Sequence, residues 1–300
     1  MKTTDDDARH VRPAARLLAG LLLLALPGSA ACADGGAAPR ARAEEASATR
    51  QEAEVAFDHS HALWTKVLEQ HVHGDRFDYA ALKEDRATFD RYLAQLERVT
   101  AAQLASWSRE QRFAFWIDVY NAYTVKLIVE NYPLETIKGL GGLFTSVWDE
   151  RFIPLEALDP KGEGRKLSLN DVEHEILRKR FEDARVHAAI NCASKSCPPL
   201  RAEAFVAKEL DAQLDEQVKA WLADPQRNRF DREKETVELS KIFEWFQDDF
   251  VRDGGSVLGW VAKYVPEERA AWLRAKGVRV RHLDYDWKLN DWRPKEREGR

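Results

Sequence analysis

The chain has 300 residues, and its 46 lysine and arginine residues against 51 aspartate and glutamate residues give a formal net charge of −5 at neutral pH. A negative net charge spread over this length argues against a nucleic acid or an anionic membrane surface as partner. The length suffices for one large domain or two small ones with a substantial core.

The first 31 residues are typical of a secretory signal peptide. Three arginines among residues 9–16 precede an apolar run from Leu17 to Leu26, and small residues follow it. The run is shorter than the roughly 20 residues that a membrane-spanning helix needs, and no later segment reaches that length. Ser29-Ala-Ala-Cys32 resembles a lipobox, which would make Cys32 a lipidation site, whereas Ala31-Cys-Ala33 fits ordinary cleavage. We therefore expect export, as a periplasmic or outer-membrane lipoprotein or as a secreted protein.

Residues 32–55 have almost no large apolar side chains and read as a disordered tether. Hydrophobic periodicity then predicts a helix ending near Gly74, a short extended piece at 77–82 and a polar helix carrying Phe89 to Leu96. The clearest element is a long amphipathic helix from about Arg109 to Asn131, with apolar side chains at 3.6-residue spacing.

Further along the chain, Ser168-Leu-Asn-Asp171 resembles an N-terminal cap and starts a predicted helix from Leu169 to Phe181. We predict strands at 186–192, 236–239 and 278–287, and helices at about 204–222, 242–250, 256–264 and 267–276. There is no repeat and no internal linker. The sequence therefore predicts one α+β domain at residues 56–290, mostly helical with a small sheet, and a polar tail at 291–300.

The stretch from Arg185 to Arg201 concentrates the candidate chemistry, and it holds the only cysteines after Cys32. If residues 186–192 form a strand, Arg185, His187 and Asn191 share one face while Cys192 lies on the other. His187 and Cys192 would then be poor partners unless the chain bends after Ile190. The simpler interpretation of His187 is a core histidine bound to a backbone carbonyl.

The predicted helix at 169–181 places Glu173 among its apolar side chains, with His174 at the edge of that face. A carboxylate on a core-facing stripe costs several kcal/mol unless it is paired or neutralised. An ion pair with Arg180 or Arg185 would explain the position. Alternatively, Glu173 orients a histidine or acts as an acid or base in a pocket.

Cys192 and Cys197 lie in a C-x4-C spacing, which differs from the C-x2-C of zinc ribbons and thioredoxin-like motifs. In an exported protein a disulfide is the default, although so short a loop contributes only about 2–3 kcal/mol. The alternative is that Cys192 is a nucleophile activated by His174 or His187, with Cys197 as its reversible partner. The pairs His59/His61 and His71/His73 flank the first predicted helix. Histidines near the end of a helix interact favourably with its dipole, so a metal site is not needed to explain these pairs.

Four segments resemble the domain of unknown function 547 family: Phe115 to Ala122, Leu167 to His174, Arg185 to Pro199 and Asp284 to Asn290. They occur in order over most of residues 57–290. Ala188 replaces the family's usual aromatic residue and Lys288 its closing serine. The resemblance implies a shared fold and motif set, and no established reaction. Its motifs map onto Asn121, Glu173, His174, Arg185, His187, Cys192 and Cys197.

These residues predict a thiol-dependent hydrolase or transferase acting on a peptide-like or acyl substrate. Cys192 would be the nucleophile, His174 or His187 the base, and Glu173 or Asn121 the group that orients it. Asn121, Arg185 and Asn191 are the candidates for substrate binding. The alternative is a non-catalytic cell-envelope binding domain, stapled by a Cys192–Cys197 disulfide, with the aromatic loop at 144–152 as contact surface. We expect a small-molecule or peptide ligand and neither a cofactor nor a metal.

Overall fold

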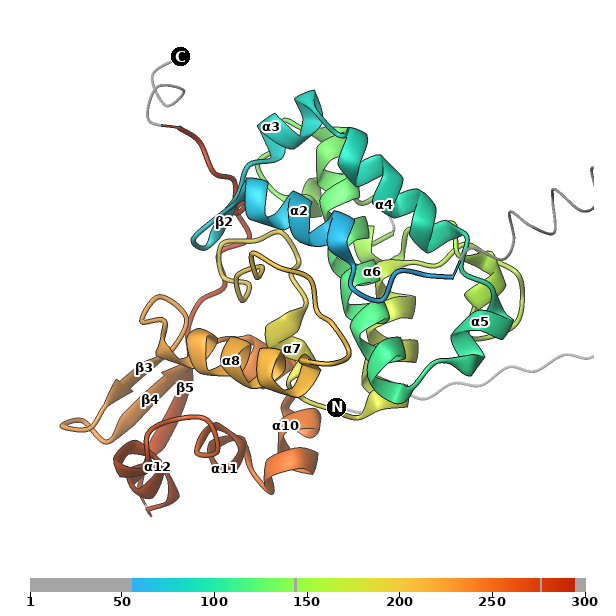
Figure 1. The fold of residues 1–300 in the computed structure, drawn as a ribbon. Helices are drawn as coiled ribbons and strands as arrows, with labels where there is room; N and C mark the ends of the chain where they lie inside the picture. Colours follow the sequence, from blue (N-terminus) through green and yellow to red (C-terminus); the bar gives the residue numbers. More distant parts are fainter. Residues whose placement is uncertain (1–55, 143–144, 276, 295–300) are drawn as a thin grey trace, which may run out of the picture. The chain divides into compact units, whose positions relative to one another are not determined.

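The computed structural model describes residues 56–142, 145–275 and 277–294, and these form one compact unit (Figure 1). The predicted signal peptide, the lipidation candidate Cys32 and the tether lie outside the described residues, as does Phe144. The described chain is mostly helical, with one two-stranded and one three-stranded sheet, which confirms the predicted α+β class. None of its helices is both long and apolar enough to cross a membrane.

The long helix α6 (Arg109–Asn131) is the centre of the first half, and its bounds match the prediction. Ser108 and Gln111 form a capping box at its start: the Ser108 hydroxyl accepts the Gln111 N–H at 3.1 Å, and the Gln111 side chain accepts the Ser108 N–H at 2.9 Å. α6 is buried on most sides because α3 and η4 pack against it. The other helices here are α2 (Ala62–His71), α3 (Tyr79–Glu84), α4 (Ala87–Glu97) and α5 (Ala101–Ser106).

The extended piece expected at 77–82 is mostly helical, so that prediction is wrong beyond its first residue. Strands β1 (Val72–His73) and β2 (Arg76–Phe77) form a short hairpin, and α3 begins two residues later. Asp78 causes the change, since its carboxylate accepts the Ala81 N–H at 2.9 Å and caps the helix.

The helix expected at 169–181 is present, and most of it is wound more widely than an α-helix. Residues 169–170 lead into the π-helix η4 (Asp171–Phe181). Its predicted cap is confirmed: the Ser168 hydroxyl accepts the Asp171 N–H at 3.0 Å, and the Asp171 carboxylate accepts the Ser168 N–H at 2.9 Å. π-Helical segments are rare and frequently occur at functional sites. Three 3-10 turns, η1 (Ile137–Leu140), η2 (Val147–Asp149) and η3 (Glu156–Leu158), lie between α6 and η4.

The strand predicted at 186–192 is not formed. Instead the segment makes one helical turn, α7 (Val186–Ala189), followed by an extended Ile190 and a loop. The Asn121 side chain takes the place of a neighbouring strand, because it donates to the Ala189 carbonyl and accepts the Asn191 N–H, both at 2.9 Å. The alternation of faces expected for a strand therefore does not apply to His187 and Cys192.

The second half contains the three-stranded sheet, in the order β3 (Arg229–Asp231), β4 (Thr236–Leu239) and β5 (Arg279–His282). β3 and β4 are antiparallel, and β4 and β5 are parallel. β4 matches the prediction, whereas the last strand is shorter than expected. The helices are α8 (Leu210–Ala223), α9 (Ile242–Trp245), α10 (Gln247–Gly254), α11 (Val257–Val261) and α12 (Glu267–Arg274).

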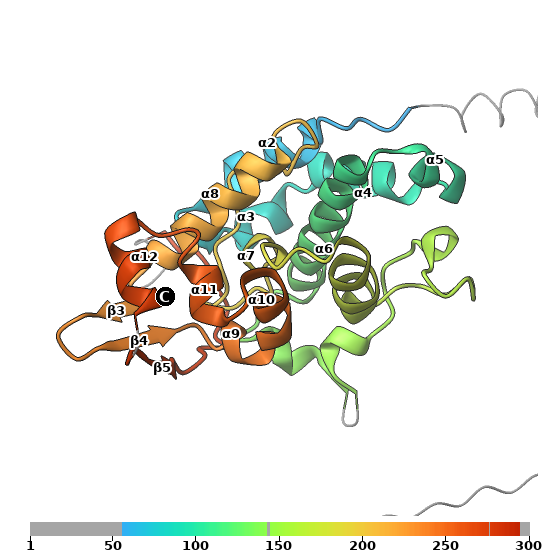
Figure 2. The ribbon, with the colours of Figure 1, turned by 90° about the horizontal axis from the view of Figure 1, so that it is seen from below.

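Two hydrophobic cores meet at α7. One core surrounds α6, and the other lies among α8, β4 and α10–α12. Val186 and Ala189 of α7 belong to the first core, whereas Ala188 belongs to the second. Figure 2 shows α10–α12 with the three-stranded sheet, at the end of the molecule opposite α4 and α5. The short helix that carries His187 therefore joins the two halves.

The packed chain extends past the expected boundary at residue 290. Asp291 accepts a hydrogen bond from the Tyr132 hydroxyl at 2.9 Å. The backbone N–H of Trp292 donates to the Phe77 carbonyl at 2.9 Å, and its ring stacks on His73 at 4.0 Å. Residues 291–292 thus fasten the C-terminal segment to the β1–β2 hairpin.

Candidate functional site

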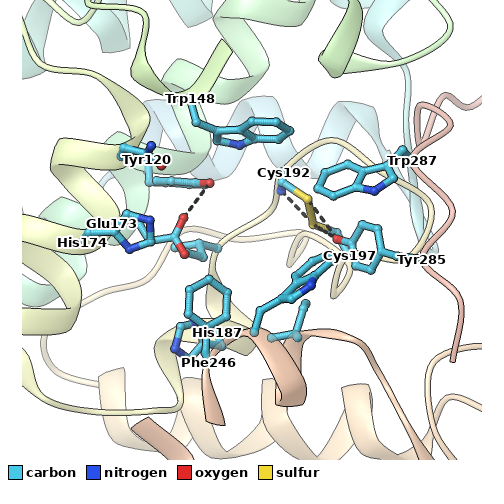
Figure 3. Close-up of a pocket in the computed structure, with 14 residues that line it drawn as sticks. Tyr120, Trp148, Glu173, His174, His187, Cys192, Cys197, Phe246, Tyr285 and Trp287 are labelled. Carbon is cyan, nitrogen blue, oxygen red and sulfur yellow. Dashed lines mark hydrogen bonds between the residues drawn. A yellow bond between two sulfur atoms is a disulfide. The ribbon is translucent and has the colours of Figure 1, made fainter. Parts of the chain in front are cut away.

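An aromatic-lined cleft lies where the two cores meet, beside α7 (Figure 3). Its walls come from α6, η2, η4, α7 and α9, and from the cysteine loop and the segment after β5. The cavity has a volume of about 170 Å³. One water molecule needs only about 10–15 Å³ on the same measure, so the cleft has room for a small ligand or for one group of a larger one.

The cleft brings together five of the residues singled out in the sequence: Glu173, His174, His187, Cys192 and Cys197. Asn121, Arg185 and Asn191, which were expected to bind substrate, are not among its lining residues. The Arg185 guanidinium instead binds the carboxylates of Asp183, Asp211 and Asp215, at 2.6–2.8 Å.

Glu173 is only 7% exposed, and the Tyr120 hydroxyl donates to its Oε2 at 3.2 Å. Neither arginine expected as its partner reaches it, since Arg180 donates to the Pro160 carbonyl and Arg185 binds aspartates. Burial raises the pKa of Glu173 to about 7, against the opposing effect of the Tyr120 hydrogen bond. Glu173 is therefore a buried carboxyl group that exchanges its proton near neutral pH.

His174 lies next to Glu173 on η4, and Arg178 Nη1 lies 3.0 Å from its Nδ1. Because a guanidinium can only donate, Nδ1 is the accepting nitrogen, and a neutral ring carries its proton on Nε2. Burial and the neighbouring Arg178 charge both lower the pKa of His174. His174 is consequently a neutral side chain at physiological pH and a weak base.

His187 is 2% exposed, and its Nε2 lies 2.8 Å from Oδ2 of Asp249. The expected carbonyl partner is thus replaced by a carboxylate from α10. The imidazole ring stacks on Phe246 at 4.2 Å. Burial lowers the pKa of His187, although the Asp249 hydrogen bond opposes this effect. The ring is held neutral and in one orientation.

Asp249 was not predicted as a site residue. Its Oδ2 accepts a hydrogen bond from Arg178 Nε at 2.6 Å, and its Oδ1 lies 3.2 Å from Arg252 Nη1. Although burial opposes ionisation, the hydrogen bonds from His187 and Arg178 hold the pKa of Asp249 well below its usual range. Arg178 therefore connects the two histidines of the cleft, because it contacts both His174 and Asp249.

Cys192 and Cys197 form a disulfide, with their Cα atoms 6.2 Å apart. The Tyr285 hydroxyl lies 3.1 Å from the Cys192 sulfur and 3.2 Å from the Cys197 sulfur. Within the described chain, no hydrogen bond joins either sulfur to a histidine. The bridge closes a sequence separation of 5 residues, for which chain entropy supplies only about 2 kcal/mol.

The loop that carries the cysteines is fastened by polar groups independent of the sulfurs. Asn191 donates from Nδ2 to the Pro198 carbonyl at 2.7 Å and accepts the Ala193 N–H at 2.8 Å. Arg227 donates from Nε to the Cys197 carbonyl and from Nη2 to the Lys195 carbonyl, both at 2.7 Å. Asn191, like Asn121, therefore holds the loop in position from outside the cleft.

Aromatic rings form the wall beside the disulfide. Trp287 lies 5.3 Å from Trp148, 5.7 Å from Trp245 and 4.5 Å from Tyr285, measured between ring centroids. Trp245 is 45% exposed and marks the rim. Trp148 comes from the aromatic loop identified in the sequence, and Tyr285 and Trp287 come from the closing motif of the family resemblance. No sequence feature pointed to Trp245.

One histidine of the two pairs near the first helix, His61, has a buried hydrogen-bond partner. His61 is buried, and its Nδ1 lies 2.7 Å from the Tyr92 hydroxyl. Burial lowers the pKa of His61 to about 3, so the ring is neutral. No group of three or more histidine, cysteine, aspartate or glutamate side chains in the described ranges could hold a metal ion.

Comparison with known protein families identifies a match to part of the chain. The family model described as "Protein of unknown function, DUF547" matches residues 104–222. This span contains α6, η4, α7 and the cysteine loop, whereas Asp249, Tyr285 and Trp287 lie beyond it. No curated protein and no solved structure matches the chain. Residues 104–222 are therefore similar to the domain of unknown function 547 family.

Proposed function

We propose that the cleft is the active site of a thiol-dependent hydrolase or transferase that acts on a peptide-like or acyl substrate. Cys192 is the nucleophile once the disulfide is reduced, and Glu173 transfers the proton. One observation carries the proposal: the Cys192 sulfur and the buried Glu173 carboxyl face the same small cleft (Figure 3).

Glu173 has the properties of a general acid and base. A group with a pKa of about 7 is present in both protonation states at neutral pH, which suits proton transfer in either direction. In the proposed reaction, the Cys192 thiolate attacks the substrate carbonyl and the leaving group takes a proton from Glu173. A thioester forms, and water or an acceptor then attacks its carbonyl while the Glu173 carboxylate receives the proton of the attacking group. The bond to the Cys192 sulfur breaks, which releases the acyl product and returns Cys192 to the thiolate.

The histidines are assigned supporting roles, whereas the sequence predicted that one of them is the base and that Glu173 orients it. His174 Nδ1 is occupied by Arg178, and His187 Nε2 is occupied by Asp249. Neither ring forms a hydrogen bond with a sulfur in the described part of the chain. We propose that His187 and Asp249 hold α7 in position and that Glu173 transfers the proton.

The aromatic wall supports an apolar or planar substrate group. Trp148 and Trp287 lie beside the disulfide, and Trp245 is at the rim. Aromatic faces bury aliphatic chains and stack on planar amides. An acyl chain or a peptide group lying against this wall would present its carbonyl to Cys192.

Export is part of the proposal, and it rests on the leader sequence. An oxidising compartment favours the disulfide, so the nucleophile would need a reductant to become free. The mass of the mature N-terminal peptide tests this part. A lipid-modified Cys32 would indicate a lipoprotein, and an unmodified cleaved terminus would indicate a secreted or periplasmic protein.

A non-catalytic cell-envelope binding domain is the second candidate, and the disulfide itself favours it. In the bonded state Cys192 is no nucleophile, and the aromatic wall alone could hold a ligand. This candidate predicts ligand binding that is the same in the oxidised and reduced protein.

Hydrolysis of p-nitrophenyl acyl esters separates the two candidates. We expect turnover by the wild-type protein only after reduction, turnover by Cys197→Ser without reductant, and none by Cys192→Ser. Cys197→Ser is the matched control, because it removes the same bridge and leaves the proposed nucleophile in place. Equal rates in the two variants would contradict the proposal and favour the binding domain.

A further inference from the structure

We propose that the Cys192–Cys197 disulfide is a thiol–disulfide exchange centre, opened by a low-molecular-weight thiol that enters the cleft and attacks Cys192. This activity is separate from acyl transfer and does not depend on it. It rests on how the two sulfurs differ in exposure, on the donors around Cys197 and on the anchoring of the loop.

The two cysteines differ in access. Cys197 is 3% exposed, whereas Cys192 is only partly buried, and both line the cleft. Exchange requires the incoming sulfur to reach the disulfide, and access helps to decide which sulfur is attacked. A thiol in the cleft therefore meets Cys192, and Cys197 becomes the leaving group.

Two donors lie within hydrogen-bond distance of the Cys197 sulfur and would stabilise its thiolate, and one of them, Tyr285, is shared with Cys192. The Cys192 backbone N–H donates to the Cys197 sulfur at 2.9 Å, and the Tyr285 hydroxyl lies 3.2 Å from it. The Ser194 hydroxyl donates to the Tyr285 oxygen at 3.0 Å, which leaves the Tyr285 proton free to point at sulfur. Burial raises the pKa of Tyr285 above its usual range, so the phenol keeps that proton.

The exchange step balances without a further reactant. The thiolate of the small thiol forms a bond to the Cys192 sulfur, the Cys192–Cys197 bond breaks, and its electron pair remains on Cys197 as a thiolate. A second thiol attacks the mixed disulfide at the sulfur of the first one. The products are a small-molecule disulfide and the dithiol form of the protein, so the small thiol is oxidised and the protein is reduced.

The loop keeps its anchors when the bridge opens. Asn191 holds both Ala193 and Pro198, and Arg227 holds the carbonyls of Lys195 and Cys197. The Lys195 N–H also donates to the Lys288 carbonyl at 2.8 Å. None of these contacts involves sulfur. Reduction therefore opens the bond while the fold stays intact, as reversible exchange requires.

The test uses the full folded protein and cysteamine, a thiol small enough for the cleft. The oxidised protein is incubated with cysteamine, quenched with acid, alkylated with iodoacetamide and analysed by mass spectrometry, while circular dichroism monitors the fold. We expect reduction in the folded state, and a mixed disulfide whose cysteamine is attached to the Cys192 side of the loop. A bond that resists cysteamine until the protein unfolds would overturn the proposal.

Single-cysteine variants test the direction of attack. With cystamine, the disulfide of cysteamine, we expect Cys197→Ser to form its mixed disulfide at least about tenfold faster than Cys192→Ser, because Cys192 is the more accessible cysteine. Equal rates would overturn the assignment of Cys192 as the attacked sulfur.

Tyr285→Phe tests the leaving group. Loss of a hydrogen bond to the thiolate should slow reduction by about tenfold. Tyr132→Phe is the matched control, since that hydroxyl binds Asp291 away from the cleft, and its rate should be unchanged. An unchanged rate in Tyr285→Phe would overturn the role of Tyr285. None of these assays uses an acyl substrate, so failed exchange and failed ester hydrolysis are separate results.

Discussion

The Tyr120 hydroxyl lies 3.2 Å from Glu173 Oε2, and it is the one hydrogen-bond donor to that carboxyl group from among the described residues. The contact joins the central helix α6 to the π-helix η4 at the edge of the cleft. Tyr120 stabilises the charged form of Glu173, whereas burial opposes it. The balance between these two effects sets the pKa of Glu173.

Tyr120→Phe should raise the pKa of Glu173 further, because it removes the donor that stabilises the carboxylate. The pH at which ester hydrolysis reaches half its maximum should move upward, and the fold should lose about 1 kcal/mol of stability. Rate–pH profiles of the reduced protein measure the first effect, and urea unfolding measures the second. An unmoved profile would show that Glu173 does not limit the reaction.

Glu173→Gln should remove a pH dependence of folding stability. The pKa of Glu173 is about 7 in the folded protein against 4.5 for the free side chain, so the folded state holds more protons between these values. Stability must then fall as pH rises through this window, by up to about 3 kcal/mol. Urea unfolding at pH 5 and pH 8 should show this loss in the wild type and a smaller loss in the variant. The same pH dependence in both proteins would contradict the assigned pKa.

Asp249→Asn should destabilise the protein by about 3 kcal/mol, because it leaves His187, Arg178 and Arg252 without their shared carboxylate. The low pKa of Asp249 means that its contribution is present above the unfolded pKa and is lost only in strong acid. Thermal unfolding at pH 7 measures the effect. The exposed neighbour Asp248 provides the control, and Asp248→Asn should leave the melting temperature nearly unchanged.

Asn121→Asp should displace the α7 segment without altering the cleft chemically. A carboxylate still accepts the Asn191 N–H but cannot donate to the Ala189 carbonyl, so a buried acceptor loses its partner. We expect a loss of about 2 kcal/mol in urea unfolding. Asn131→Asp, at the exposed end of the same helix, is the control. Equal losses would show that the Asn121 bridge does not hold α7.

Several elements were predictable because local sequence determines them. The bounds of α6 follow from its capping box and its apolar spacing, and the start of the next helix follows from Ser168 and Asp171. The placement of Glu173 in apolar surroundings also followed from periodicity. In each case the decisive contacts join residues within one or two helical turns.

The rest depended on contacts between distant parts of the chain. Residues 186–192 have an apolar pattern that suits a strand, but Asn121 satisfies their backbone from 68 and 70 residues away. Asp249 meets His187 across 62 residues, on a helix whose sequence has no motif to mark it. Trp245 lines the cleft only because α9 ends beside it. Periodicity cannot detect such contacts, because they depend on tertiary packing.

Alkylation of the native, reduced protein by iodoacetamide tests whether Cys192 is the nucleophile of the cleft. We expect Cys192 to be alkylated in the folded protein while buried Cys197 is protected, and we expect an acyl substrate to slow the labelling by occupying the cleft. Mass spectrometry of the tryptic peptide distinguishes the two cysteines. If Cys192 reacts only after unfolding, or reacts at the same rate with and without substrate, Cys192 is not the nucleophile of this site.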